Sequence, residues 1–202
     1  MAMETWKKNR WTIFYMVTWI YLILELGIIF LRTARLPHTM IYFKWAIWPE
    51  AALGMVVVLS LAQVMQYFLE SPRIVAGVYL YAATNFIVVT IAFDHVSDAT
   101  IGTISLLPLL YYIICLFRVR APEVSLYFRW IASLQIFTIV FNIAFNYQHI
   151  AYSSYLRMIP TLVRLSPYVM VLVMLTRMLH MPPEYVSSFE KEIESIGEST
   201  EE

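Results

Sequence analysis

Long apolar segments separated by short polar ones dominate this chain. Six such segments cover residues 11–31, 50–69, 74–93, 100–117, 124–146 and 158–179. Each is close to the length of about 20 residues that an α-helix needs to cross the hydrocarbon core of a bilayer. None alternates apolar and polar residues, as the strands of a membrane β-barrel do. The pattern predicts an all-α, polytopic bundle of about six transmembrane helices, antiparallel to their chain neighbours because the connections are short.

The composition supports this prediction. Hydrophobic residues make up 60% of the 202 residues and charged residues only 14%, whereas about a quarter of the residues are charged in an ordinary soluble domain. The formal net charge is zero, which gives no electrostatic reason to expect nucleic acid as a partner. We therefore expect the lipid bilayer to be the main partner of the chain and the plasma membrane to be its location.

The distribution of Lys and Arg predicts the orientation in the membrane. If consecutive spans alternate in direction, nine of the 14 basic residues fall on the side of the N-terminus, four fall on the opposite side, and Arg164 lies within a span. Basic residues are enriched in cytoplasmic loops. Arg32, Arg35 and Lys44 run against the trend, but the balance predicts that both termini are cytoplasmic.

Two segments differ in character from the spans. Residues 39–48 are rich in aromatics and contain Lys44, a composition that favours the headgroup layer. We expect a short interfacial helix there, and the alternative is one long helix from Thr39 that bends at Pro49. Residues 1–181 then form one transmembrane domain. Residues 182–202 form an acidic cytoplasmic tail, with seven Glu against one Lys.

Two charged residues lie inside predicted spans. Glu25 and Arg164 are each six residues from the outer end of their span, a depth of about 9 Å at the rise of an α-helix. An unpaired charge at that depth is costly. We therefore predict an ion pair that joins the first span to the last.

A polar stripe follows the fifth span. Its members recur at spacings of three or four, which places them on one face of a helix: Gln135, Thr138, Asn142, Asn146 and His149. A polar face in a membrane requires polar neighbours or a water-filled cleft. The stripe ends on the outer side, where the predicted topology also places four further polar residues: His38, Asp94, His95 and Asp98.

The sequence IAFDHVSDAT, residues 91–100, has three interpretations. It is a charged turn in which Asp98 caps the next helix, a metal site, or the rim of a pocket. The metal site would use His38, His95, His149 and Asp98, ligand types that suit zinc or another first-row metal. No HExxH motif supports it, and no other cofactor is expected.

We favour the pocket as the functional hypothesis. Glu25 and Arg164 form its charged floor, Asn142 and Asn146 form its wall, and the rim is made by Asp94, His95, Asp98 and His149. Such an outward-facing pocket would bind a small polar ligand or ion in a carrier, channel-like subunit or sensor input.

Two other functional classes stay open. The chain is a structural or accessory subunit of a larger membrane complex, with a protein partner on its tail or lateral face, or it is an intramembrane metal-dependent enzyme. We find no P-loop, no Rossmann glycines and no nucleophile elbow, so a non-enzymatic role is the expectation.

Overall fold

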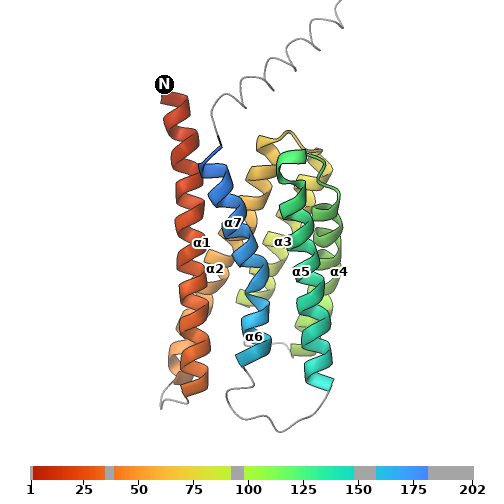
Figure 1. Ribbon diagram of the computed structural model, residues 1–202. Helices are drawn as coiled ribbons and strands as arrows, with labels where there is room; N and C mark the ends of the chain where they lie inside the picture. The colour runs from red at the N-terminus through yellow and green to blue at the C-terminus, as the bar shows by residue number, and fades with distance from the viewer. Residues whose placement is uncertain (1, 35–38, 92–97, 148–157, 182–202) are drawn as a thin grey trace, which may run out of the picture.

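The structure is a computed structural model that describes residues 2–34, 39–91, 98–147 and 158–181. The described residues form helices and no strands (Figure 1). The helices are α1 (Ala2–Ala34), α2 (Thr39–Tyr67), α3 (Pro72–Ile91), α4 (Asp98–Phe117), α5 (Pro122–Tyr147), α6 (Met158–Arg164) and α7 (Ser166–Leu179). The all-α prediction is confirmed.

Each predicted span corresponds to a helix or, for the last one, to the consecutive pair α6 and α7. Four stretches are long and apolar enough to cross a membrane: Asn9–Leu31, Trp48–Tyr67, Pro122–Phe145 and Leu162–Leu179. In α4 the apolar part is shorter and covers Ser105–Phe117. Several helices are thus suited to a bilayer.

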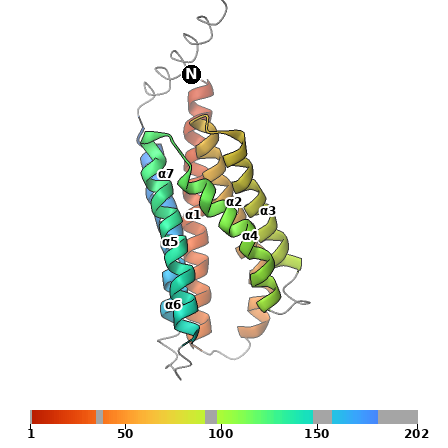
Figure 2. The same ribbon diagram turned by 90° about the vertical axis from the view of Figure 1, so that its right-hand side faces the viewer.

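The helices form a ring in chain order. Each of α1 to α5 packs against the next, and α5 packs against both α6 and α7. The ring closes where α7 packs against α1 (Figures 1 and 2). The start of α1, the α2–α3 turn, the α4–α5 loop and the end of α7 all lie at one end of the bundle (Figure 1). We call it the N-terminal end.

The expected interfacial helix over residues 39–48 is not a separate element. The backbone is helical from Thr39 to Tyr67, with Pro49 inside α2. Proline removes one backbone hydrogen bond and crowds the carbonyl four residues earlier, which bends a helix or breaks it. Here the helix continues, so the alternative of one long helix is correct.

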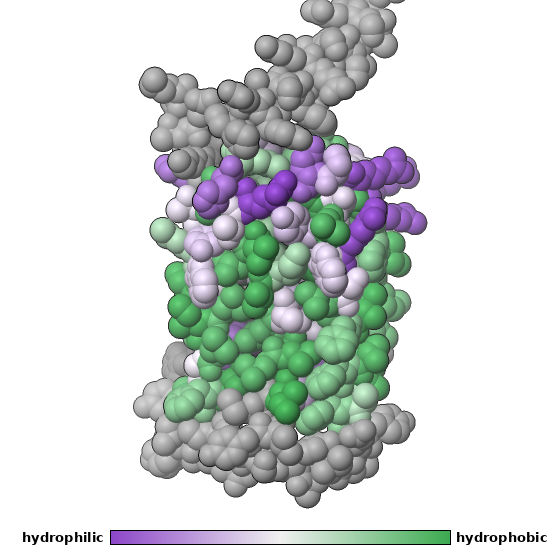
Figure 3. Space-filling view, in the orientation of Figure 1, coloured by the Kyte–Doolittle hydropathy of each residue, from purple (hydrophilic) through white to green (hydrophobic). Residues whose placement is uncertain are grey.

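The interior of the ring is apolar, and so is much of its outer surface. Leu61 and Met65 from α2, Phe128 from α5 and Met174 from α7 are fully buried. Large apolar side chains on the outside form a wide band around the body of the bundle, and hydrophilic residues gather at the N-terminal end (Figure 3). Soluble proteins rarely expose so much continuous apolar surface, whereas lipid tails accommodate it.

Gln63 on α2 links three helices inside this end of the bundle. Its side-chain oxygen accepts a hydrogen bond from Arg10 Nη1 on α1 at 3.3 Å, and its Nε2 donates to the Tyr79 hydroxyl on α3 at 3.1 Å. A polar side chain inside an apolar bundle is stable when it finds such partners. The bridge holds α1, α2 and α3 in register.

The contact between α3 and α4 is the basis of a first prediction. A Cβ added at Gly77 would collide with Cys115 Sγ and lie 2.8 Å from Tyr111 Cε1, whereas a Cβ at Gly27 on α1 would meet nothing within 4 Å. We expect Gly77→Ala to destabilise the bundle by about 1–3 kcal/mol, the usual cost of overpacking. Gly27→Ala should be neutral or stabilising by up to about 1 kcal/mol.

Unfolding of the detergent-solubilised protein, followed by circular dichroism, measures both effects. Gly27→Ala is the matched control, since it makes the same chemical change inside a helix. Equal stability of the two variants would contradict the close α3–α4 packing.

Candidate functional site

The predicted ion pair between Glu25 and Arg164 is present. Arg164 Nη2 lies 3.3 Å from Glu25 Oε2 and donates a hydrogen bond to it. The side chain of Glu25 is 2% exposed and that of Arg164 49%. The other carboxylate oxygen of Glu25 accepts a hydrogen bond from the Tyr21 hydroxyl at 2.9 Å. Both oxygens of a buried charge are thus satisfied, as burial in an apolar interior requires.

Arg164 lies at a break in the last apolar segment. It is the final residue of α6, and α7 begins at Ser166. Pro167 has no N–H, so it cannot donate to the carbonyl of Val163 four residues earlier. The Ser166 hydroxyl donates to that carbonyl instead, at 2.8 Å, as the sequence position of Ser166 suggests.

A second hydroxyl reaches the same carbonyl from the neighbouring helix. Thr138 on α5 is buried, and its Oγ1 donates to Val163 O at 3.4 Å. The break therefore connects α5 to the last segment at the level of the ion pair. Such discontinuous helices bring backbone polar groups and charged side chains together inside a bundle.

Four tyrosines form two ring pairs in the interior, and Tyr21 contacts Glu25 directly. The Tyr21 ring packs on the Tyr168 ring, with centroids 4.8 Å apart, and Gly54 on α2 leaves room for the Tyr21 ring, which would lie 3.4 Å from a Cβ there. Tyr81 on α3 and Tyr112 on α4 stack with centroids 4.4 Å apart. Tyr81 and Tyr112 lie within electrostatic range of Tyr168. Aromatic faces and hydroxyls thus line the interior on several sides.

A second carboxylate acts on the same guanidinium. Glu50 on α2 lies within electrostatic range of Arg164 and of Tyr168. The cluster therefore contains two carboxylates, Glu25 and Glu50, and one guanidinium.

The structure describes only part of the predicted pocket. Asn142 is partly buried on α5, and its Nδ2 donates to Thr138 O within the same helix at 2.8 Å. Asn146 belongs to α5, and Asp98 begins α4, but the described side chains include neither. His38, Asp94, His95 and His149 lie outside the described residues. The pocket rim and the metal site therefore stay predictions, and among the described residues no group of three His, Cys, Asp or Glu could hold a metal ion.

Sequence reasoning missed the tyrosines and Glu50. A signal for two of the tyrosines was present, because Tyr21 lies four residues before Glu25 and Tyr168 four residues after Arg164. Residues four apart lie on the same face of a helix, so each charge has a phenol beside it. Nothing in the spacing indicated Glu50.

The unequal burial of the ion pair yields a second prediction. We expect Arg164→Gln to destabilise the protein by about 3–5 kcal/mol, because it leaves a buried carboxylate without its counter-charge. Glu25→Gln should cost about 1–2 kcal/mol, since the half-exposed Arg164 can turn its head towards the interface. The double variant Glu25→Gln/Arg164→Gln should be more stable than Arg164→Gln alone.

A double-mutant cycle on the free energy of unfolding measures this coupling. Arg177→Gln, which removes an exposed guanidinium from α7, is the control for the loss of one positive charge. Additive losses in the cycle would show that the two side chains do not stabilise each other.

Comparisons with protein-family models, with curated proteins and with solved structures found no match to this chain. The ion pair, the helix break and the aromatic side chains near them are therefore the features that bear on function.

Proposed function

We propose that this protein is a multi-pass membrane protein that binds a small polar ligand or ion inside its helical bundle, as a carrier, channel-like subunit or sensor input. The observation that carries the proposal is the ion pair of Glu25 and Arg164 at the break between α6 and α7. Ionisable residues inside membrane spans are rare and commonly mark ligand or ion sites. Transporters often form such sites from discontinuous helices.

The carboxylates and the aromatic rings near Arg164 favour a cation as the ligand. Glu25 and Glu50 both lie within electrostatic range of Arg164, so a cation in this region would have two carboxylates near it. The rings of Tyr21 and Tyr168 would add the attraction of aromatic faces for a positive charge. The amide of Asn142 and the predicted rim of Asp94 and His149 would complete an outward-facing entrance.

The proposed topology has six spans, with both termini in the cytoplasm and the protein in the plasma membrane. The basic side chains of Arg73, Arg118, Arg120 and Arg129 at the N-terminal end support this orientation, since cytoplasmic loops are enriched in Lys and Arg. The site at Glu25 then lies in the half of the bundle nearer the outside.

A third prediction tests the binding of a cation. A ligand that binds the folded state stabilises it by about 1.4 kcal/mol at ten times its dissociation constant. For a protein of this size such a gain raises the unfolding midpoint by about 3–6 °C. We expect tetramethylammonium or an alkali cation to produce this rise in the detergent-purified protein, measured by thermal unfolding.

Anions of matched size, added with the same counter-ion, should produce no rise. Glu25→Gln and Glu50→Gln should abolish the response, each compared with its own midpoint without ligand. Glu123→Gln at the opposite end of the bundle is the control and should respond like the parent protein. A response to anions instead would overturn the cation class. If no cation produces a response that is lost in Glu25→Gln, the binding site is overturned and an accessory subunit is favoured.

A further inference from the structure

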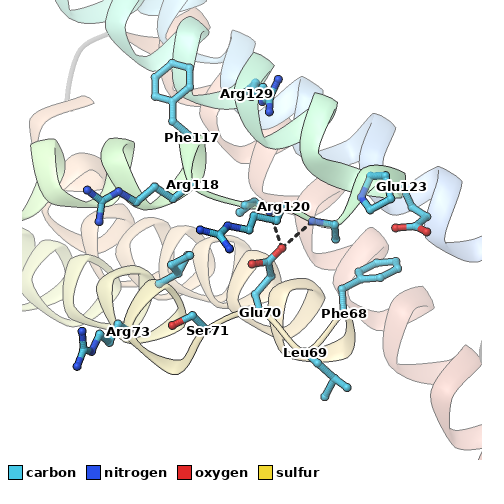
Figure 4. A pocket seen from close by; sticks show the side chains of 14 residues that line it. Phe68, Leu69, Glu70, Ser71, Arg73, Phe117, Arg118, Arg120, Glu123 and Arg129 are labelled. Carbon is cyan, nitrogen blue, oxygen red and sulfur yellow. Dashed lines mark hydrogen bonds between the residues drawn. The ribbon is translucent and has the colours of Figure 1, made fainter. Parts of the chain in front are cut away.

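A second polar site lies at the other end of the molecule. The α2–α3 turn, the α4–α5 loop and the start of α5 enclose a cleft of about 1120 Å³ (Figure 4). Its lining includes Arg73, Arg118, Arg120 and Arg129. Arg73 lies at the start of α3, Arg118 and Arg120 lie in the α4–α5 loop, and Arg129 lies in the first part of α5, so the cleft exists only where the two connections meet.

A carboxylate holds the two connections together. Glu70 in the α2–α3 turn accepts hydrogen bonds from the backbone N–H groups of Arg120 at 2.6 Å and Ala121 at 2.7 Å (Figure 4). These are short, charge-assisted hydrogen bonds. They link the turn to the N-terminus of α5, and the carboxylate of Glu70 is thereby engaged by backbone N–H groups.

The turn itself has a strained backbone. Leu69 has a φ of 52°, in the left-handed region where glycine is preferred. The Glu70 N–H donates to Met65 O at 3.0 Å and the Leu69 N–H to Gln66 O at 3.1 Å, the hydrogen bonds of a Schellman motif. This helix end directs Glu70 towards the opposing loop.

The four arginines leave a surplus of positive charge in the cleft. None of their guanidinium groups makes a hydrogen bond or an ion pair with another residue in the described part of the chain. Four arginines against Glu70 and Glu123 give the lining an excess of two positive charges. A guanidinium presents its N–H groups in a planar fork that matches the oxygens of a phosphate.

The depth of the cleft indicates the source of the phosphate. It lies where the apolar helices end, and Phe68, Ile74 and Phe117 share its lining with the arginines. In a membrane this is the level of the headgroups, with the acyl chains beside the apolar part. The volume is ample for one headgroup.

We propose that this cleft binds the phosphate headgroup of an anionic phospholipid at the cytoplasmic surface of the membrane. The inference needs the bundle to lie in a bilayer, but it does not depend on the cation site at Glu25. Arg118 and Arg120 from the α4–α5 loop, with Arg73 from the start of α3 and Arg129 from α5, supply the positive charge and the N–H donors that attract the phosphate. Anionic lipids are concentrated in the cytoplasmic leaflet, which matches the orientation predicted from the basic residues.

Native mass spectrometry of the full chain, released from detergent micelles with equal amounts of phosphatidic acid and phosphatidylcholine, tests the proposal. We expect preferential retention of phosphatidic acid. Arg118→Gln and Arg120→Gln should each weaken it about five-fold, the typical effect of one basic residue near an anionic membrane surface. Arg118→Lys should give a smaller loss, because it keeps the charge and removes the fork.

Arg177→Gln is the matched control, because it removes one exposed arginine from the same end of the bundle but outside the cleft. It should leave the preference unchanged. An equal loss in this control would show that the lipid preference comes from general surface charge, and it would overturn the site. Equal retention of the two lipids would overturn it as well.

Excess inorganic phosphate, added to the same samples, distinguishes a lipid headgroup from a soluble phosphate compound as the ligand of the cleft. We expect it to displace little of the lipid, because the lipid also contacts the apolar part of the cleft. Complete displacement by inorganic phosphate would assign the cleft to a soluble phosphate compound instead of a lipid. Circular dichroism of each variant establishes that a loss of binding is not a loss of folding.

Discussion

Burial of a charge inside an apolar bundle is the constraint on which the rest of this structure depends. Glu25 is almost fully enclosed, so it must be paired to exist there as a carboxylate. Its partner Arg164 comes from the opposite end of the sequence. The pair therefore joins α1 to the last apolar segment, where α6 and α7 pack against α1 and close the ring.

The break between α6 and α7 follows from the same need to satisfy polar groups. Pro167 leaves the carbonyl of Val163 without its usual N–H, and two hydroxyls, those of Ser166 and Thr138, supply the missing hydrogen bonds. Water is absent from the hydrocarbon core, so only side chains or neighbouring helices can do this. The interruption is thereby stable, and it places Arg164 beside the tyrosines.

Charged side chains are arranged differently at the two ends of the molecule. Near Glu25, the opposite charges of Glu25 and Arg164 are paired, and aromatic rings lie beside them. At the N-terminal end, four arginines line an open cleft and the carboxylate of Glu70 is occupied by backbone N–H groups. A paired, buried charge suits selective recognition of a small ligand. An open surplus of charge suits attraction of an anionic surface, which is effective within about 10 Å at moderate salt.

The apolar segments were sufficient to predict an all-α chain and the approximate bounds of its helices, because the thickness of a bilayer sets the length of a span. The depth of Glu25 and Arg164 was sufficient to predict their pairing, because an isolated charge there is too costly. Spacing could not reveal that Glu50 and the stacked Tyr81 and Tyr112 share the same interior. Their meeting depends on how each helix is rotated about its axis and which helices become neighbours across the ring. Nor could it show that the arginines of two separate connections line one cleft, since that requires Glu70 to reach the opposing loop. The sequence also could not decide whether α2 continues through Pro49. A proline permits either a bend or an end of a helix, and the packing around it decides between them.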